Sequence, residues 1–344
     1  MPPQSYQPTT PVTPPTPSPA KRRSWFGLVG LLLVVLVGLF VYSQKQAIYD
    51  YIRLYNYEPS SEVTALASTT SMTKKSEHIF YVNRPQVQGK DDFNASCPIG
   101  SEETNVLGCY LPQGRGIFIY NVTDPQLKGV KEVTAAHEML HGAYDRLSAK
   151  ERQRIDGLLQ DYYANSLKDE RLLGIIESYK KTEPNDIPNE MHSIFGTEIA
   201  VLPPALEDYY KQYFNDRQVV VRLAANYQAA FTSRKAQIAT YDAQLATLKD
   251  TINAAETSLE GQAAALATKR TELNAFLASN DTATYNAQVA AFNAQVQAYN
   301  NLLAKTKQQI NQYNSIVEAR NAIALETQNL AQELNSRVPD QAAQ

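Results

Sequence analysis

Two histidines and a glutamate are spaced so that they could hold a metal ion and use it. The segment Thr134–Gly142 reads TAAHEMLHG and contains His137, Glu138 and His141. On a helix, residues four apart lie one turn apart on the same face, so both imidazoles could grip a single ion. Glu138 would project about 100° away from His137, where it could take a proton from a water molecule held by that ion. The pattern predicts one Zn²⁺ per chain, with His137 and His141 as ligands and Glu138 as general base.

The HExxH match is improbable as an accident of composition. The chain has four histidines among 344 residues, so about 0.003 such matches are expected by chance. The alternative, two ordinary helix histidines beside a solvated glutamate, is therefore disfavoured. An apolar stripe beside the motif predicts a buried helix, and its members are Val133, Ala136, Leu140, Ala143 and Leu147.

The motif and its surroundings resemble the zincin metallopeptidases, whose HExxH helix lies beneath an edge strand that holds the substrate peptide. By this resemblance, the β-branched and aromatic segment Gly116–Val122 would be that strand. The metzincin branch carries a third histidine where this chain has Leu147, which excludes that branch. The gluzincin branch takes its third ligand, a glutamate, from a later helix.

The segment Pro188–Ala200 resembles that later helix. Asn189-Glu190 followed by Ile194–Thr197 is similar to the thermolysin group, although the interval from His141 is longer here. The resemblance covers only these two helices and the strand. Two histidines and one glutamate would leave a fourth position open for water, as in catalytic zinc sites.

Two glutamates are candidates for the third ligand. The Asn-Glu context favours Glu190, whereas Glu198 falls among apolar positions on a helical wheel, where a carboxylate must be paired or metal-bound. Whichever of them is not the ligand could orient an imidazole. His192 is a candidate for stabilising the oxyanion of a tetrahedral intermediate, with an ordinary surface histidine as the alternative. Asp145, one turn beyond His141, is interpreted as a solvated surface carboxylate, with a role in supporting a metal ligand as the alternative.

Local patterns predict the elements around the motif. Glu62–Ser76 is expected to be a helix, and His78–Val82 a short strand ended by Pro85. The pattern becomes helical from Glu132 onward. A capping-box signature, Ser148-Ala-Lys-Glu151, predicts the start of a further helix.

The two cysteines, Cys97 and Cys109, lie in a loop-rich stretch between the two expected strands. A disulfide between them would close that loop and stabilise the fold by about 3 kcal/mol. The alternative is a pair of buried thiols. Two cysteines are too few for an all-thiolate zinc site.

The N-terminal part predicts a membrane anchor. Residues 1–24 are rich in proline and predict a disordered tail, and residues 25–42 form an apolar run without charge that is long enough for a transmembrane helix. Lys21-Arg22-Arg23 precede the run, so the positive-inside rule places the tail in the cytoplasm and the remainder outside, at a membrane that we expect to be bacterial. A cleaved signal peptide is the alternative.

Residues 219–338 carry heptad repeats in two arms separated by Ser279–Thr282. This pattern predicts a long antiparallel coiled-coil hairpin, with two intermolecular coiled coils as the alternative. The seam of the first arm consists of Ile238, Leu245, Ile252, Leu259, Leu266 and Leu273. The seam of the second arm consists of Val289, Val296, Leu303, Ile310 and Val317.

The expected fold class is an α+β zincin-like domain over residues 51–213, mostly helical with a small sheet, followed by the hairpin. The resemblance implies a membrane-anchored, extracytoplasmic zinc metallopeptidase acting on a peptide or protein, with the coiled coil as a possible protein-docking element. Two alternatives are a scaffold whose metallopeptidase-like domain has no turnover and a zinc amidase acting on peptidoglycan stem peptides. The net charge of −3 gives no support for binding nucleic acid.

Overall fold

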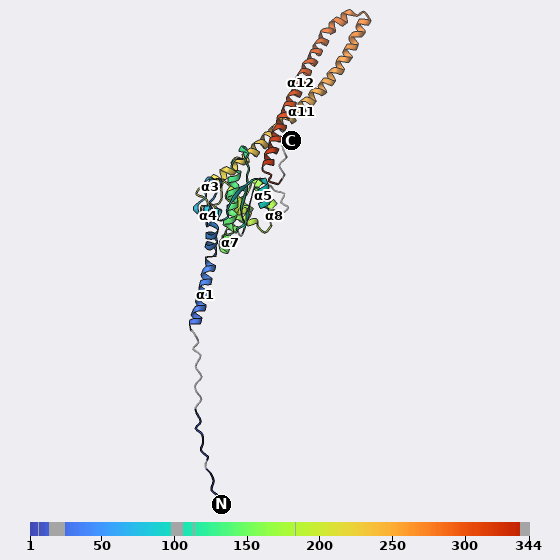
Figure 1. The fold of residues 1–344 in the computed structure, drawn as a ribbon. Helices are drawn as coiled ribbons and strands as arrows, with labels where there is room; N and C mark the ends of the chain where they lie inside the picture. Colours follow the sequence, from blue (N-terminus) through green and yellow to red (C-terminus); the bar gives the residue numbers. More distant parts are fainter. Residues whose placement is uncertain (6, 14–24, 98–105, 113, 183, 338–344) are drawn as a thin grey trace. The chain divides into compact units, whose positions relative to one another are not determined.

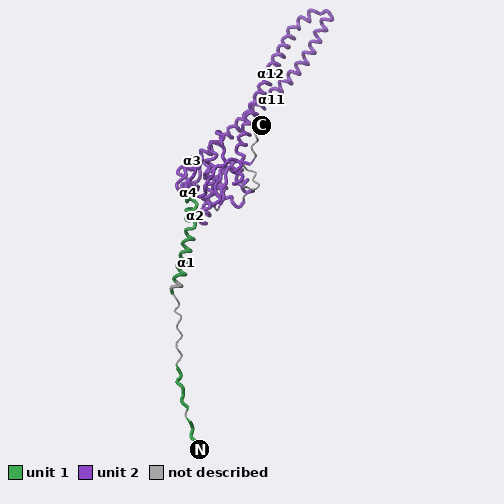
Figure 2. Tube along the Cα trace, viewed as in Figure 1, with its two compact units in different colours: residues 1–55 green, residues 56–344 purple. Residues whose placement is uncertain are grey.

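The computed structural model describes residues 1–5, 7–13, 25–97, 106–112, 114–182 and 184–337. These residues are mostly helical, with one small sheet. The chain divides into two compact units, residues 1–55 and residues 56–344 (Figure 2). The basic cluster Lys21–Arg23 and the C-terminal residue of the expected hairpin, Val338, lie outside the described residues, as does part of the proline-rich tail.

The first unit contains helices α1 (Trp25–Ser43) and α2 (Lys45–Leu54). No single helix among the described residues combines the length and apolar character that a membrane crossing requires. Val29–Ser43 of α1 and Lys45–Leu54 of α2 reach that length and apolar character only when they are taken together, and they meet at a bend of 59°. The transmembrane helix at residues 25–42 therefore stays a prediction.

The second unit contains the remaining helices and a three-stranded sheet (Figure 1). The helices and strands that precede the HExxH helix are α3 (Ser61–Thr69), α4 (Lys74–Val82), β1 (Gln86–Gln88), α5 (Lys90–Ser96), β2 (Gly108–Leu111), β3 (Gly116–Tyr120) and η1 (Pro125–Leu127). The others are α6 (Val130–Tyr144), α7 (Ala149–Asn165), α8 (Glu170–Thr182), α9 (Ile187–Glu198), α10 (Pro204–Tyr210), α11 (Arg217–Ala278) and α12 (Thr282–Glu333).

The sheet has the order β1-β3-β2, with β1 parallel and β2 antiparallel to β3. All five residues of β3 are buried, and both of its edges are paired. The expectation that Gly116–Val122 forms the edge strand is therefore wrong, because this apolar segment occupies the centre of the sheet. The strand at the edge beside α6 is β2, a four-residue strand paired with β3 from Gly108↔Ile119 to Leu111↔Gly116.

The expected strand at His78–Val82 is wrong, since these residues form the second half of α4. Thr73 caps this helix by accepting a hydrogen bond from the Ser76 backbone N–H, and Ile79, Phe80 and Val82 are buried. The expected helix at Glu62–Ser76 is also interrupted. Helix α3 ends at Thr69, and Ser71 adopts a left-handed conformation with φ of 57°, so the chain reverses before α4 begins.

Helix α6 lies at the centre of the second unit and packs against α3, α4, α9, α11, β2 and β3. It begins after Gly129, whose φ of +107° favours glycine, and a Cβ there would lie 2.7 Å from the Leu223 carbonyl oxygen on α11. The next helix, α7, starts at the predicted capping box, where Ser148 accepts a hydrogen bond from the Glu151 backbone N–H. The HExxH motif is thus held in the core by elements from both ends of the unit.

Helices α11 and α12 pack against each other as a hairpin, in agreement with the heptad pattern (Figure 1). The turn between them includes Asn280 in a left-handed conformation, and the Asp281 carboxylate caps α12 by accepting from the Thr284 backbone N–H at 3.0 Å. The predicted seam residues are buried or half-buried along both arms. The arms pair within one chain, so the hairpin is favoured over two intermolecular coiled coils.

The predicted disulfide between Cys97 and Cys109 is present, with the two Cα atoms 6.2 Å apart. It belongs to a small second core that Leu330 of α12 also enters. Beyond α12, Arg337 donates hydrogen bonds to Asn94 Oδ1 at 2.7 Å and to the Cys97 carbonyl oxygen at 3.2 Å. Leu330 of α12 and Arg337 after it therefore pack around the Cys97–Cys109 disulfide, which joins the end of α5 to β2.

Candidate metal centre

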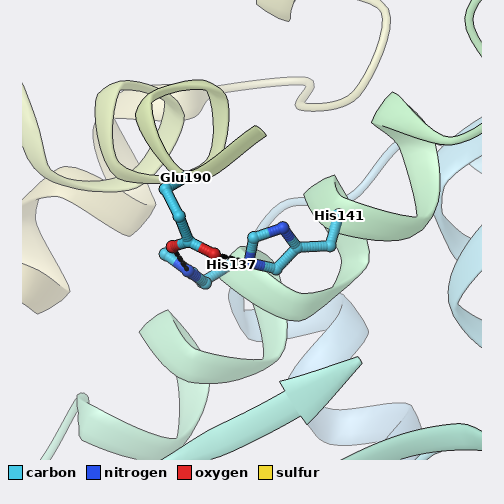
Figure 3. Close-up of side chains that lie close together, drawn as sticks. All are labelled: His137, His141 and Glu190. Carbon is cyan, nitrogen blue, oxygen red and sulfur yellow. Dashed lines mark ion pairs between the residues drawn. The ribbon is translucent and has the colours of Figure 1, made fainter. Parts of the chain in front are cut away.

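Three side chains from two packed helices converge in the interior of the second unit. His137 and His141 lie one turn apart on α6, and Glu190 comes from the first turn of α9. His137 Nε2 lies 3.7 Å from Glu190 Oε2, and His141 Nε2 lies 3.5 Å from Glu190 Oε1. The carboxylate points toward both imidazoles (Figure 3). One ligand atom from each residue lies within 4.8 Å of the others, so the three could hold a metal ion.

The spacing of these atoms fits a shared divalent cation. The distances of 3.5 and 3.7 Å exceed the range of a hydrogen bond between nitrogen and oxygen. Tetrahedral bonds of about 2.0–2.1 Å to one zinc ion would separate its ligand atoms by about 3.3–3.4 Å. Glu190 Oε2 is buried and has no hydrogen-bond partner. A buried carboxylate oxygen without a donor is costly, and a cation would satisfy it.

The charge state of Glu190 suits a ligand. Burial alone would raise its pKa, but His141, His137 and a hydrogen bond from the Tyr179 hydroxyl together lower the pKa below its ordinary value. The carboxylate is therefore ionised at neutral pH. Arg217, at the start of α11, donates a hydrogen bond to the Ile199 carbonyl oxygen at 2.6 Å. This bond holds the C-terminal end of α9, the helix that carries Glu190.

Glu138 lies on the same helix turn as the two histidines and is 5% exposed. The backbone N–H of Tyr110 in β2 acts on its carboxylate and favours the ionised form. Burial raises the pKa of Glu138 above its ordinary value, because the ionised form loses hydration. The Tyr110 ring also lies nearly parallel to the His141 ring, with centroids 6.5 Å apart. The edge strand thus touches both the expected base and one expected ligand.

Gly108 in β2 is needed for this close approach. A Cβ at this position would lie 2.7 Å from Glu138 Oε1 and 2.5 Å from Thr134 Cγ2. We expect Gly108→Val to displace the Glu138 carboxylate and to reduce any activity that depends on it by about 100-fold or more, in line with the cost of misplacing a catalytic group. Metal binding should be retained, because the three candidate ligands lie on other elements. Comparing turnover and bound zinc in this variant separates the two effects.

A cavity of about 740 Å³ opens onto the three clustered residues and Glu138. Its walls come from β2, from α6, from one face of α8 and from α9, and Tyr227 of α11 also lines it. The α8 face consists of Arg171, Ile175 and Tyr179, which are spaced four apart. This volume is ample for several side chains of a bound peptide.

The alternative third ligand, Glu198, lines the same cavity but does not join the cluster. Its Oε2 lies 2.7 Å from an Arg171 nitrogen and accepts a hydrogen bond from Gln228 Nε2 at 2.7 Å. The carboxylate that the sequence places among apolar positions is therefore paired, as expected, but with Arg171 and not with a metal ion. No hydrogen bond from either imidazole to Glu198 occurs among the described residues, so it does not orient an imidazole directly.

The structure does not bring His192 to the cavity. Its ring is fully buried, packs among Tyr144, Tyr209 and Tyr210, and makes a hydrogen bond of 2.8 Å between Nε2 and the Tyr209 hydroxyl. Its Nδ1 has no hydrogen-bond partner. The proposed oxyanion role is thus unsupported, because α9 turns this side chain toward the core. Asp145, in contrast, lines the cavity and accepts a hydrogen bond from the Tyr110 hydroxyl at 2.9 Å.

The burial of His192 predicts acid sensitivity of the fold. Desolvation lowers its pKa to about 3, whereas the unfolded chain has the ordinary value of 6.5. Below pH 6.5 the unfolded state therefore gains a proton that the folded state does not, and stability is lost as pH falls toward 3. We expect the free energy of unfolding to fall by up to about 1.4 kcal/mol per pH unit more than in His192→Gln. Urea titrations with chelator at pH 7, 5 and 4 measure the free energy of unfolding of both proteins. The same dependence on pH in the two proteins would contradict the prediction.

The sequence patterns did not point to Tyr110, Arg171 or Tyr179, which also line the cavity. The first lies on a strand too short to show alternation, and the other two lie on a helix whose position over the cavity depends on tertiary packing. The regular spacing of Arg171, Ile175 and Tyr179 is visible in the sequence, but such a face is equally typical of a helix packed on a core.

The cluster agrees with the ligand set that the zincin resemblance implies. Two histidines and a carboxylate also hold divalent metals in other contexts, so the geometry describes a candidate metal centre and not a family. No protein-family model, curated protein or solved structure matches this chain.

Proposed function

We propose that this protein is a zinc-dependent metallopeptidase that hydrolyses peptide bonds in the cavity beside β2. The observation that carries the proposal is the convergence of His137, His141 and Glu190, at distances suited to one cation, with Glu138 on the same helix facing the same cavity. Such a constellation supplies ligands, a base and room for substrate in one place.

The side chains of the protein have separate roles in this proposal. His137, His141 and Glu190 would hold the ion, which when bound supplies Lewis acidity that activates water and polarises a carbonyl. Glu138 takes the proton of the attacking water and then passes it to the leaving amine. Its raised pKa makes it a better proton acceptor than a solvated glutamate. Gly108 of β2 leaves room for the Glu138 carboxylate beside the cavity.

The edge strand offers a means of holding a peptide. Among the described residues β2 pairs only with β3, and residues Leu107–Tyr110 line the cavity. An extended substrate could lie along this edge and form backbone hydrogen bonds, which give affinity with loose sequence preference. This role belongs to β2 and replaces the one expected for Gly116–Val122.

The location is part of the same proposal. A run of α1 side chains from Val29 to Tyr42 is both apolar and exposed within its unit, with Val34 at 69% and Phe40 at 65%. Exposed apolar surface of this extent is stabilised when a membrane covers it. We therefore propose that α1 lies in a membrane, and Lys21-Arg22-Arg23 ahead of it favour the extracytoplasmic side for the cavity.

Hydrolysis by the full chain tests this function. The detergent-purified protein is incubated with an unstructured protein substrate, with and without a chelator, and zinc is then restored. We expect cleavage that the chelator stops and zinc restores. Bound zinc without cleavage would instead support a metal-binding scaffold, and cleavage restricted to peptidoglycan stem peptides would support an amidase. Cleavage that ignores the chelator would overturn the assignment.

A further inference from the structure

Helices α8 and α9 run side by side in opposite directions and are tied together at two points of the cavity wall. At one tie, Tyr179 and Glu190 line the cavity together, and the Tyr179 hydroxyl lowers the pKa of the Glu190 carboxylate. At the other, Arg171 forms an ion pair with Glu198 at 2.7 Å. Tyr179 therefore marks the metal end of the cavity, and Arg171 marks a second, distant end.

The two ties are separated by the same number of residues on both helices. Arg171 and Tyr179 are eight positions apart on α8, as are Glu190 and Glu198 on α9. At about 1.5 Å per residue, each helix separates the two ties by about 12 Å. An extended peptide covers about 12 Å with three to four residues. A substrate whose scissile bond lies at the metal end would therefore place a side chain three or four positions away beside Arg171.

The chemistry at that distant end favours an anion. Arg171 is the one lysine or arginine among the described residues that line the cavity. Its side chain is 37% exposed, whereas that of Glu198 is 11% exposed. Glu198 receives both Arg171 and Gln228 on Oε2, so it acts as an anchor for the guanidinium. Arg171 has five N–H donors in a planar fork, and one ion pair leaves several of them for a second carboxylate.

The carboxylates elsewhere on the wall are engaged locally and do not compete for this position. Asp145 accepts from the Tyr110 hydroxyl, and Asp186 accepts from Asn189 Nδ2 at 3.0 Å. Glu138 and Glu190 belong to the metal end. The exposed part of the guanidinium is therefore the charged group presented to a ligand at the far end.

We infer that Arg171 is a specificity-determining residue, which binds a carboxylate of the substrate three or four residues from the scissile bond. This inference rests on the proposed peptidase function and names the substrate class, an acidic peptide. The carboxylate can belong to an aspartate or glutamate side chain or to the C-terminus of the peptide. Glu198 and Gln228 hold the guanidinium in place for this contact.

A positional peptide series tests the inference with the full chain and zinc. Glutamate or glutamine is placed at each of positions two to five on either side of the scissile bond, and C-termini are free or amidated. We expect kcat/KM to be about 10-fold higher for glutamate at position three or four on one side, through a lower KM, as a charge-assisted hydrogen bond gives. Amidation distinguishes a C-terminal carboxylate from a side chain.

Variants show whether Arg171 causes the preference. Arg171→Gln should lose the preference, so that the ratio of kcat/KM for the glutamate peptide to that for the glutamine peptide falls to about one, while Arg171→Lys should retain part of it. Lys180→Gln is the matched control, because Lys180 is on the same helix and 38% exposed but does not line the cavity. It should keep the full preference. A purely structural role of Arg171 would instead change both peptides equally and so overturn the inference.

Binding gives a second readout that does not need turnover. Affinities of the glutamate and glutamine peptides for a Glu138→Gln protein should differ by the same factor of about 10. If peptides are cleaved without preference, or with a preference for basic residues, this inference fails while the peptidase function stands. If no peptide is cleaved and none binds, the proposed function itself fails.

Discussion

Glu138→Gln is expected to reduce kcat/KM by about 10²–10⁴-fold while the protein stays folded and keeps its zinc. Glutamine matches glutamate in shape but cannot accept a proton, so the attacking water loses its base. The side chain does not belong to the His137/His141/Glu190 cluster, and metal affinity should therefore be unchanged. Turnover of an unstructured protein and zinc content, measured on one preparation, report the two quantities together.

The matched control for this experiment is Glu132→Gln. Glu132 is on the same helix, six residues before the base, and does not line the cavity. Its replacement removes the same charge and should leave turnover within a factor of two or three of the wild type. If Glu138→Gln retains full hydrolysis, the base has been misassigned. If that variant instead loses its zinc, the carboxylate is a ligand.

Glu190→Gln is expected to weaken zinc binding by more than 100-fold, and Glu198→Gln by less than about 10-fold. The first change replaces an ionised ligand by a neutral amide, and its effect should exceed the 10–100-fold range seen for residues that only support ligands. The second leaves the cluster intact and breaks the tie to Arg171. Competition with a chromogenic chelator measures both affinities.

These two substitutions form a matched pair, since both remove one carboxylate from the same helix and the same cavity wall. The thermal midpoint adds an independent check, because a ligand that binds only the folded state raises stability by mass action. Excess zinc should raise the midpoint of the wild type and of Glu198→Gln, and leave that of Glu190→Gln nearly unchanged. The opposite pattern would assign Glu198 as the third ligand.

The part of the site that depends on local spacing could be predicted from the sequence. His137 and His141 face the same way because a helix turns 3.6 residues per turn, and this holds whatever packs around it. The hairpin is similar, since its heptads repeat over many turns in both arms. The disulfide followed from there being only two cysteines in the chain. Each of these features is set by near neighbours or by simple counting.

The part that depends on non-local packing could not be predicted in the same way. Glu190 and Glu198 both lie on α9, and helix periodicity does not separate them. What separates them is Arg171 on α8, which neutralises one of the two. The edge strand was missed because Gly108–Leu111 is short and lacks alternation. The segment Gly116–Tyr120 stood out in the sequence because it is apolar, and its apolar side chains are also the reason that it lies at the buried centre of the sheet.

His78–Val82 shows the ambiguity of short apolar runs. Periodicity alone does not distinguish a five-residue strand from one turn of a buried helix. The deciding contacts are distant ones: the Thr73 hydroxyl donates to the Gln212 carbonyl oxygen at 2.8 Å and Ser76 donates to the Tyr213 carbonyl oxygen. These bonds join the start of α4 to residues more than 130 positions away, and no local pattern contains them.

The metal content of the purified full-length protein tests the central claim most directly. The wild-type chain and His137→Ala are saturated with zinc, dialysed against metal-free buffer and measured by elemental analysis alongside protein concentration. We predict one zinc ion per wild-type chain and the loss of most of that zinc in His137→Ala, because the cluster of His137, His141 and Glu190 loses an imidazole. Zinc absent from both proteins, or equal in both, would contradict the account.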